Sequence, residues 1–277
     1  MQLKCSQNVF HGLVTAFILF TSCLVAVMPA HTNELLDKPT KEITLAVGVS
    51  IPPYINIETQ QGVESQIIRE AFGKEGYKVK LKFLSTQGIF NNFKALQVDA
   101  MLVSRSKDNL DGEVQSAFLS SAIINYHNYA ISLKNANHQL ANIKSLSQFR
   151  VIGFSSATKV LGDEFAEAID KSKLYREVAE QTDQVIALYR NMVDVVIADP
   201  VIFSHFQYKL KEAFGEYHEV TMHDLFAPSP RHITFRNRID RDSFNRGLNK
   251  IKANGRYQAI LAFNSENFTY LINQRKL

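Results

Sequence analysis

Cysteine is nearly absent from this chain of 277 residues, and its two copies, Cys5 and Cys23, both lie near the N-terminus. If processing removes that end, the mature chain has no cysteine at all. A disulfide, a thiolate nucleophile and a cysteine-ligated metal site are then excluded. The apolar fraction of 45% is that of an ordinary globular protein, and the length allows one large domain or two small ones.

Long basic runs are absent too, and the net charge is only +4. This argues against nucleic acid as a partner. One basic stretch, RHITFRNRIDR at residues 231–241, spans a strand and a helix start, so we expect it to be a solvated face. The eight histidines show no metal-ligand spacing, and His127 and His232 are expected in surface or hinge packing. We therefore expect no metal site and no cofactor.

Charge is missing from Gly12 to Met28, after a single Lys4, and the sequence MPA ends at Ala30. This pattern predicts an export signal over residues 1–30, followed by a loose leader at 31–41. Because the apolar run is long for a signal, an uncleaved anchor remains the alternative. An exported chain without cysteine suggests the periplasm of a Gram-negative bacterium.

Strand and helix patterns then alternate along the chain. Apolar, breaker-free runs predict strands, and helical spacing of apolar residues predicts helices. The expected strands are 42–49, 78–84 and 98–104, with helices at 63–76 and 88–96. Such β-α-β-α-β order predicts a mostly parallel sheet with helices on both faces.

The same order restarts at residue 148. Strands are expected at 148–156, 174–179 and 193–199, with helices at Lys159–Ile169 and 181–192. Each half carries one shared feature, an apolar residue ahead of a Val-Asp pair, Val98-Asp99 in the first half and Val193-Asp194 in the second. We therefore predict two α/β lobes of the same architecture.

Two extended segments can connect the lobes, the breaker-free residues 124–134 and APSPRHITF at 227–235, after which a helix is expected from Asp240 to Ala253. Two crossings return the end of the chain to the first lobe. The predicted division is residues 42–126 plus 230–277 for lobe 1 and 127–229 for lobe 2.

Ordered landmarks over roughly residues 42–265 resemble the family 3 extracellular solute-binding proteins, the periplasmic components of polar amino-acid transporters. They are GVSIPPY, GVESQIIREAF, FKALQVDAML, SLSQFRVIGFSSAT, VDVVIAD and FNRGLNKIKANGRYQAIL. The resemblance implies two α/β lobes, joined by two hinge strands, that close on a small solute. It also implies an ABC permease in the inner membrane as a partner, and we expect a monomer.

Asp199 follows the apolar strand pattern VDVVIAD and precedes Pro200. Ligands of open parallel sheets bind beyond the carboxyl ends of strands, and a partly desolvated carboxylate there needs a cation. The resemblance implies that Asp199 pairs with the ammonium group of the solute. The alternative is that Asp199 only caps a helix that begins at Pro200.

Other candidate contacts follow from the same resemblance. Ser156 and Thr158 lie between a strand and a helix, where free N–H groups favour an anion such as the solute carboxylate, or where they act as ordinary caps. Ser104 and Ser106 follow a strand of lobe 1. The arginine expected near Asp111 is missing, and Arg105 either replaces it or forms a surface ion pair. Tyr54 is expected as an aromatic wall or as core.

These patterns favour a non-catalytic binding protein for a small polar solute, such as an amino acid or related amine. A sensor or scavenger on the same fold, with a solute that is not an amino acid, is the alternative. A dehydratase-type enzyme is a third possibility, but it requires an acid and base pair that Asp199 and Arg105 hardly supply.

Overall fold

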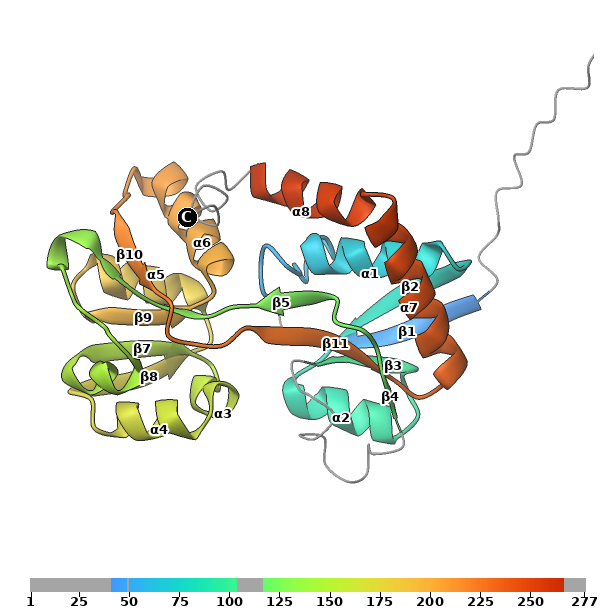
Figure 1. The fold of residues 1–277 in the computed structure, drawn as a ribbon, viewed down its shortest axis with the longest axis horizontal. Helices are drawn as coiled ribbons and strands as arrows, with labels where there is room; N and C mark the ends of the chain where they lie inside the picture. The colour runs from blue at the N-terminus through green and yellow to red at the C-terminus, as the bar shows by residue number, and fades with distance from the viewer. Residues whose placement is uncertain (1–40, 49, 104–116, 267–277) are drawn as a thin grey trace, which may run out of the picture. The chain divides into compact units, whose positions relative to one another are not determined.

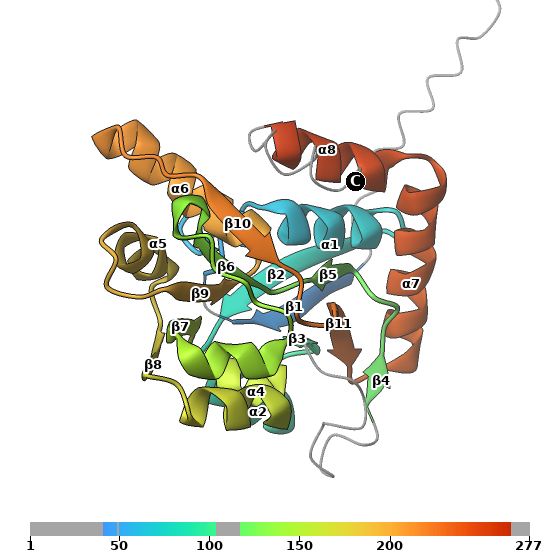
Figure 2. The same cartoon turned by 60° about the vertical axis from the view of Figure 1, so that its left-hand side comes forward.

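The structure is a computed structural model, and it describes residues 41–48, 50–103 and 117–266. The expected signal at 1–30 and all but the last residue of the leader at 31–41 lie outside these ranges. Within the described part of the chain, two sheets are each flanked by helices (Figures 1 and 2). This is the predicted mixed α/β fold. No helix among the described residues combines the length and the apolar character needed to cross a membrane.

The first sheet has the strand order β2-β1-β3-β11-β4, and β5 also pairs with β11. Strands β1, β2 and β3 are parallel, whereas β11 runs antiparallel to its partners. The strands are β1 Lys41–Val47, β2 Tyr77–Phe83, β3 Ala100–Val103, β4 Phe118–Leu119, β5 Ile124–Tyr126 and β11 Ser229–Phe235. The late strand β11 thus completes the sheet begun by the first strands of the chain.

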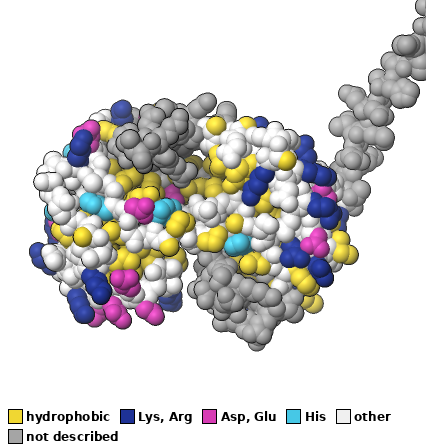
Figure 3. Space-filling view, in the orientation of Figure 1, with side chains coloured by type: hydrophobic (Ala, Val, Ile, Leu, Met, Phe, Trp, Pro, Cys, Tyr) yellow, Lys and Arg dark blue, Asp and Glu magenta, His cyan; other side chains and the backbone are white. Residues whose placement is uncertain are grey.

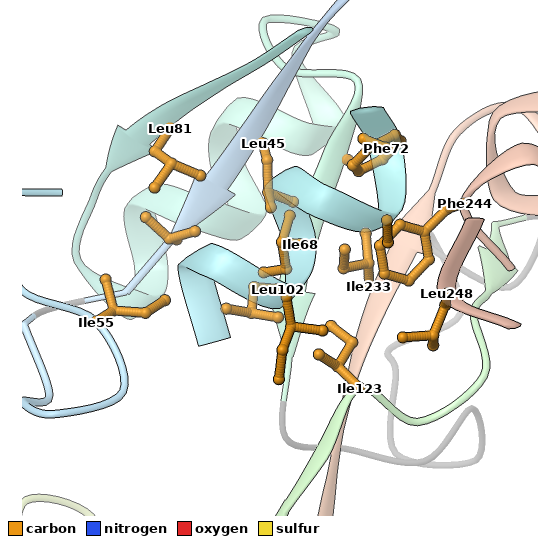
Figure 4. Packing of buried hydrophobic residues seen from close by; sticks show 14 of the residues in the cluster. Leu45, Ile55, Ile68, Phe72, Leu81, Leu102, Ile123, Ile233, Phe244 and Leu248 are labelled. Carbon is orange, nitrogen blue, oxygen red and sulfur yellow. The ribbon is translucent and has the colours of Figure 1, made fainter. Parts of the chain in front are cut away.

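Helices cover both faces of this sheet. Alternate residues of β1 point to opposite sides, so Ile43 and Leu45 pack in one core and Ala46 in another. Figure 4 shows Leu45 and Leu102 of the sheet packed with Ile68 and Phe72 of α1. The helices are α1 Val63–Gly73, α2 Thr86–Lys94, α7 Arg238–Ala253 and α8 Arg256–Glu266. Burial on both faces explains why the central strands β1 and β3 carry apolar runs without alternation, whereas the edge strand β2 alternates lysine with apolar residues.

The second sheet has the order β10-β6-β9-β7-β8. Strand β7 pairs in parallel with β8 and β9, and β6 lies antiparallel between β9 and β10. The strands are β6 Tyr129–Leu133, β7 Arg150–Phe154, β8 Leu174–Val178, β9 Val195–Ala198 and β10 Val220–His223. The helices are α3 Ala157–Leu161, α4 Asp163–Asp170, α5 Gln181–Tyr189 and α6 Pro200–Phe214, with 3₁₀ helices at Lys134–Ala136 and Ile143–Gln148.

The Val-Asp pair shared by the two halves has the same role in both sheets. The Asp99 carboxylate accepts a hydrogen bond from the Thr44 N–H of β1 at 2.7 Å, and Asp194 accepts one from the Arg150 N–H of β7 at 2.8 Å. In each case the backbone N–H of the aspartate donates in return to the same residue of the neighbouring strand. The repeated sequence feature therefore ties the amino end of β3 to β1 and the amino end of β9 to β7.

One predicted element differs in the structure. The single helix expected at Lys159–Ile169 is wrong, because Gly162, with φ of 88°, separates α3 from α4. The extended segment expected at 124–134 contains β5 and β6, which belong to different sheets, with His127 and Asn128 between them. On the face drawn in Figure 3, lysine and arginine side chains are interspersed with acidic and apolar ones.

Candidate functional site

Three parallel strands of the second sheet end side by side. Strand β7 lies between β9 and β8, and its register pairs Ile152 with Val196 and Phe154 with Val178. Asp199 follows β9 directly, and Ser156 lies two residues beyond β7. The predicted contacts Asp199, Ser156 and Thr158 therefore come from neighbouring strand ends, which is where open parallel sheets bind their ligands.

Asp199 is buried, with 3% of its surface exposed, and neutral groups hold its carboxylate. Its Oδ1 accepts hydrogen bonds from the Val201 N–H at 2.8 Å, the Ile202 N–H at 3.4 Å and the Tyr54 hydroxyl at 3.2 Å. Its Oδ2 accepts from the His127 N–H at 3.0 Å. Burial raises the pKa of Asp199, although these four hydrogen bonds oppose the rise.

The cap at the start of α6 is real, as the alternative interpretation of Asp199 expected. A cap alone, however, does not require the contacts with Tyr54 and His127, which come from distant parts of the chain. Among the described residues, no cation is hydrogen-bonded to the Asp199 carboxylate. The structure is thus compatible with Asp199 as the cap of α6 and as a contact for a cationic solute.

Tyr54 is buried beside a second aromatic ring. Its ring stacks on that of Tyr126 with centroids 4.4 Å apart, and 3% of its surface is exposed. The turn that holds Tyr54 also starts α1, since the Glu64 N–H donates to the Tyr54 carbonyl at 3.0 Å. Gly62, with φ of 138°, allows this close approach, because a Cβ there would lie 2.3 Å from the Tyr54 carbonyl oxygen.

Glu64 and Arg231 form a buried ion pair next to these tyrosines. Glu64 is fully buried and accepts from Arg231 Nε at 3.1 Å and from the Tyr126 hydroxyl at 2.9 Å. The Arg231 guanidinium lies 5.0 Å from the centroid of the Tyr126 ring. The expectation that residues 231–241 form a solvated face is therefore wrong at Arg231, because Glu64, 167 residues away, draws it inside.

Ser156 and Thr158 donate their N–H groups to a carboxylate of the protein itself. The Ser156 N–H lies 2.6 Å from Glu177 Oε2, and both the N–H and the hydroxyl of Thr158 lie 2.9 Å from Glu177 Oε1. The sequence located an anion position in this turn but did not identify Glu177. One signal was present in the sequence. Tyr175 and Glu177 are two residues apart on β8, so their side chains lie on the same face of the sheet.

Tyr175 adds a fourth donor to Glu177, with its hydroxyl 3.0 Å from Oε1. The hydroxyl fits here because Gly153 has no side chain, and a Cβ at that position would lie 2.7 Å from the Tyr175 oxygen. Burial favours the neutral acid at Glu177, but the four hydrogen bonds outweigh it and lower the pKa of the carboxyl. Glu177 is therefore an ionised side chain held in a fixed place.

The remaining predicted contacts Ser104, Arg105 and Ser106 lie outside the described residues. The two histidines near the crossings are engaged in packing. His127 Nε2 lies 2.6 Å from the Phe226 carbonyl oxygen and 2.9 Å from Asp224 Oδ1, and His232 Nδ1 lies 2.9 Å from the Ser120 carbonyl oxygen. In the described ranges, no group of three or more His, Cys, Asp or Glu side chains is placed to hold a metal ion.

Solved structures with the same fold include several binding proteins. The chain is similar to a mutant of ArgBP from T. maritima, with a TM-score of 0.61 and 14% identity, over 82% of this chain and 95% of that one. It is similar to the amino acid ABC transporter substrate-binding protein AbpA from Streptococcus pneumoniae, bound to L-arginine, with a TM-score of 0.59 and 12% identity, over 81% and 94%.

A third similar structure is a histidine kinase sensor domain described as similar to periplasmic binding proteins, with a TM-score of 0.62 and 14% identity, over 82% of this chain and 96% of that one. No family model matches the sequence, and no curated protein matches it either. At these identities the likeness establishes the fold, which is the two-lobed fold of the solute-binding proteins that the sequence resembles.

Proposed function

We propose that this chain is an exported binding protein that captures a small polar solute with an amino group and delivers it to an ABC permease of the inner membrane. The fold, which it shares with substrate-binding proteins of such transporters, supports this role. The sequence predicts two lobes. In this proposal the segment from β5 to β6 and strand β11 connect the lobes and form the hinge that closes on the solute.

Asp199 carries this proposal. Transfer of a carboxylate out of water is costly unless a cation or several hydrogen bonds compensate for it. The bonds that Asp199 receives come from neutral donors and leave its pKa raised, so the ionised form still gains from a positive partner. Oδ2 accepts one hydrogen bond from the described residues, and a carboxylate oxygen has room for two. An ammonium group would supply both a positive charge and a second hydrogen bond to Oδ2.

Tyr54 and His127 connect this carboxylate to motion of the hinge. The Tyr54 hydroxyl bond of 3.2 Å is long for an O–H donor, and the His127 N–H belongs to the segment that joins β5 to β6. We propose that opening of the hinge exposes Asp199 and that closure buries the ammonium against it. Ser104, Arg105 and Ser106 are proposed as contacts from the other lobe.

Solute capture of this kind needs no covalent step, so we propose that the protein is not an enzyme. Incubation of the protein with a bound amine should return the amine unchanged. Release of a dehydrated product would instead favour the dehydratase alternative.

A thermal-shift screen of the purified protein against amino acids, amines and organic acids tests the proposal. A bound solute raises the melting temperature by mass action. Asp199→Asn should abolish the shift for the amine that scores, because asparagine keeps the cap of α6 but carries no charge. Asp170→Asn, at an exposed position at the end of α4, is the matched control and should retain the shift. A screen in which only carbohydrates or anions score would contradict the proposal.

The sensor alternative has one observation in its favour, the likeness to the histidine kinase sensor domain. Uptake of the labelled solute by cells with and without this protein separates the two roles. A transporter component should be required for uptake, whereas a sensor should leave uptake unchanged and alter gene expression.

A further inference from the structure

The turn between β7 and α3 has its anion-binding donors already occupied. Four donors from Ser156, Thr158 and Tyr175 meet the two oxygens of Glu177 at distances from 2.6 to 3.0 Å. The groups of Ser156 and Thr158 are those that the sequence indicated for the carboxylate of a solute, and Tyr175 adds a hydroxyl that the sequence did not indicate. In this structure the protein supplies that carboxylate itself.

The turn that Glu177 occupies follows β7, the strand beside β9, so Glu177 bears on which solutes can bind at Asp199. Strands β9 and β7 are neighbours, and adjacent strands lie about 4.8 Å apart. The ammonium and carboxylate of an α-amino acid are attached to one carbon atom. A solute whose ammonium meets Asp199 therefore brings its carboxylate toward the donors of the neighbouring strand, where Glu177 already lies.

A second carboxylate beside Glu177 is disfavoured for two reasons. Glu177 satisfies the donors that would otherwise stabilise the incoming charge, and two carboxylates that share one site repel each other. In addition, among the described residues, no lysine or arginine is hydrogen-bonded to Glu177 or to Asp199. The described side of the site thus presents two negative groups and no compensating cation.

We propose that Glu177 is a specificity-determining residue that takes the place of the solute carboxylate, so that the solute is an amine or guanidine without an α-carboxylate. This inference rests on the proposed function, because it concerns the solute of the same site. Ser156, Thr158 and Tyr175 are then positioning residues, which fix the Glu177 carboxylate at the turn.

Pairs of compounds that differ only by the α-carboxylate test this inference. Arginine and agmatine, lysine and cadaverine, and histidine and histamine are titrated into the purified protein by calorimetry. For the skeleton that binds, the decarboxylated member should bind about tenfold tighter or more, since an unfavourable like-charge contact is worth at least that much.

Substitution of Glu177 tests whether this residue sets the preference. Glu177→Gln removes the charge and turns an amide N–H₂ toward the Ser156 N–H, so the affinity ratio within the pair should fall by about tenfold or more. Glu177→Ala, which frees all four donors, should reduce the ratio further. Glu167→Gln, at an exposed position on α4, makes the same charge change elsewhere and should leave the ratio as it is.

The possible results separate this inference from the proposed function. If arginine binds as tightly as agmatine, or if Glu177→Gln leaves the ratio unchanged, the role of Glu177 is wrong although amine capture stands. If no amine of any pair binds to the wild-type protein, the proposed function fails, and the inference fails with it. A melting curve for each variant confirms that it is folded.

Discussion

Two buried carboxylates, Glu64 and Asp199, each accept a hydrogen bond from one member of the stacked pair Tyr126 and Tyr54, yet they are compensated differently. Glu64 is bonded to the Tyr126 hydroxyl and to the guanidinium of Arg231. Asp199 is bonded to the Tyr54 hydroxyl and to three backbone N–H groups. The first carboxylate has an internal cation, and the second has none among the described residues.

The difference indicates a structural role for Glu64 and supports the proposed binding role of Asp199. Burial acts to lower the pKa of Arg231, but the charge of Glu64 and its hydrogen bond outweigh burial and raise the pKa, so the two side chains form a charged pair inside the protein. At Asp199 burial prevails and the pKa rises. This contrast supports the proposal that Asp199 binds a removable cation, the ammonium group of the solute.

Loss of Arg231 should have the largest effect. Arg231→Met leaves the Glu64 charge buried without its cation, and breaking a buried pair in this way costs about 3–5 kcal/mol of unfolding free energy. Urea unfolding at neutral pH measures the loss. The double variant Glu64→Gln with Arg231→Met should recover much of it. A loss below about 1 kcal/mol, typical of an exposed pair, would mean that water reaches Glu64.

Removal of the Asp199 charge should change how stability depends on pH. Because the folded pKa of Asp199 is raised, the folded state binds more protons than the unfolded state at pH values just above about 3.9, the ordinary pKa of aspartate. The contribution of this group to stability therefore falls as pH rises through that window. Asp199→Asn should lack this fall, and its free energy of unfolding should exceed the wild-type value near neutral pH.

Urea unfolding of the solute-free proteins from pH 4 to pH 7 measures this comparison. A saturating amine should raise the stability of the wild type but not that of Asp199→Asn, and it should oppose the fall of wild-type stability with pH, because the bound ammonium compensates for the charge of Asp199. Parallel curves for the wild type and for Asp199→Asn would contradict the assignment of Asp199 as an uncompensated carboxylate.

Local patterns predicted most of the framework of the site. The apolar runs predicted β7, β8 and β9 to within two residues at each end, and the Asp199-Pro200 pair marked the start of α6. Propensity and periodicity act over a few residues, so they fix such elements well. They missed the break between α3 and α4, because Gly162 interrupts a helical pattern that otherwise continues.

Long-range partners could not be predicted in the same way. Glu64 and Arg231 are far apart in sequence, and each alone resembles an exposed charged residue. Glu177 occupies the turn at Ser156 only because the register of β7 and β8 sets Gly153 opposite Glu177. Spacing along one strand cannot reveal which residue of the next strand lies beside it.

A partly exposed ion pair completes the comparison with the smallest expected effect. Arg150 and Asp194 are 2.7 Å apart, with 39% and 23% of their side chains exposed, so Arg150→Met should cost less than about 1 kcal/mol of unfolding free energy at pH 7. The Arg150 hydrogen bond lowers the pKa of Asp194 despite partial burial. The contribution of this pair is therefore present above the ordinary aspartate pKa and is lost as pH falls through the lower folded value.

Salt distinguishes the Arg150 pair from the buried one. Urea unfolding measures how much unfolding free energy Arg150→Met removes at each salt concentration. This loss should be smaller in about 1 M salt than in about 0.1 M salt, since screening at the higher concentration acts on exposed charges over a few ångströms. The cost of Arg231→Met should stay nearly the same, because Glu64 is out of reach of mobile ions. An equal response of the two variants to salt would mean that burial does not set the difference between these pairs, and it would weaken the interpretation of Asp199, which depends on the same burial.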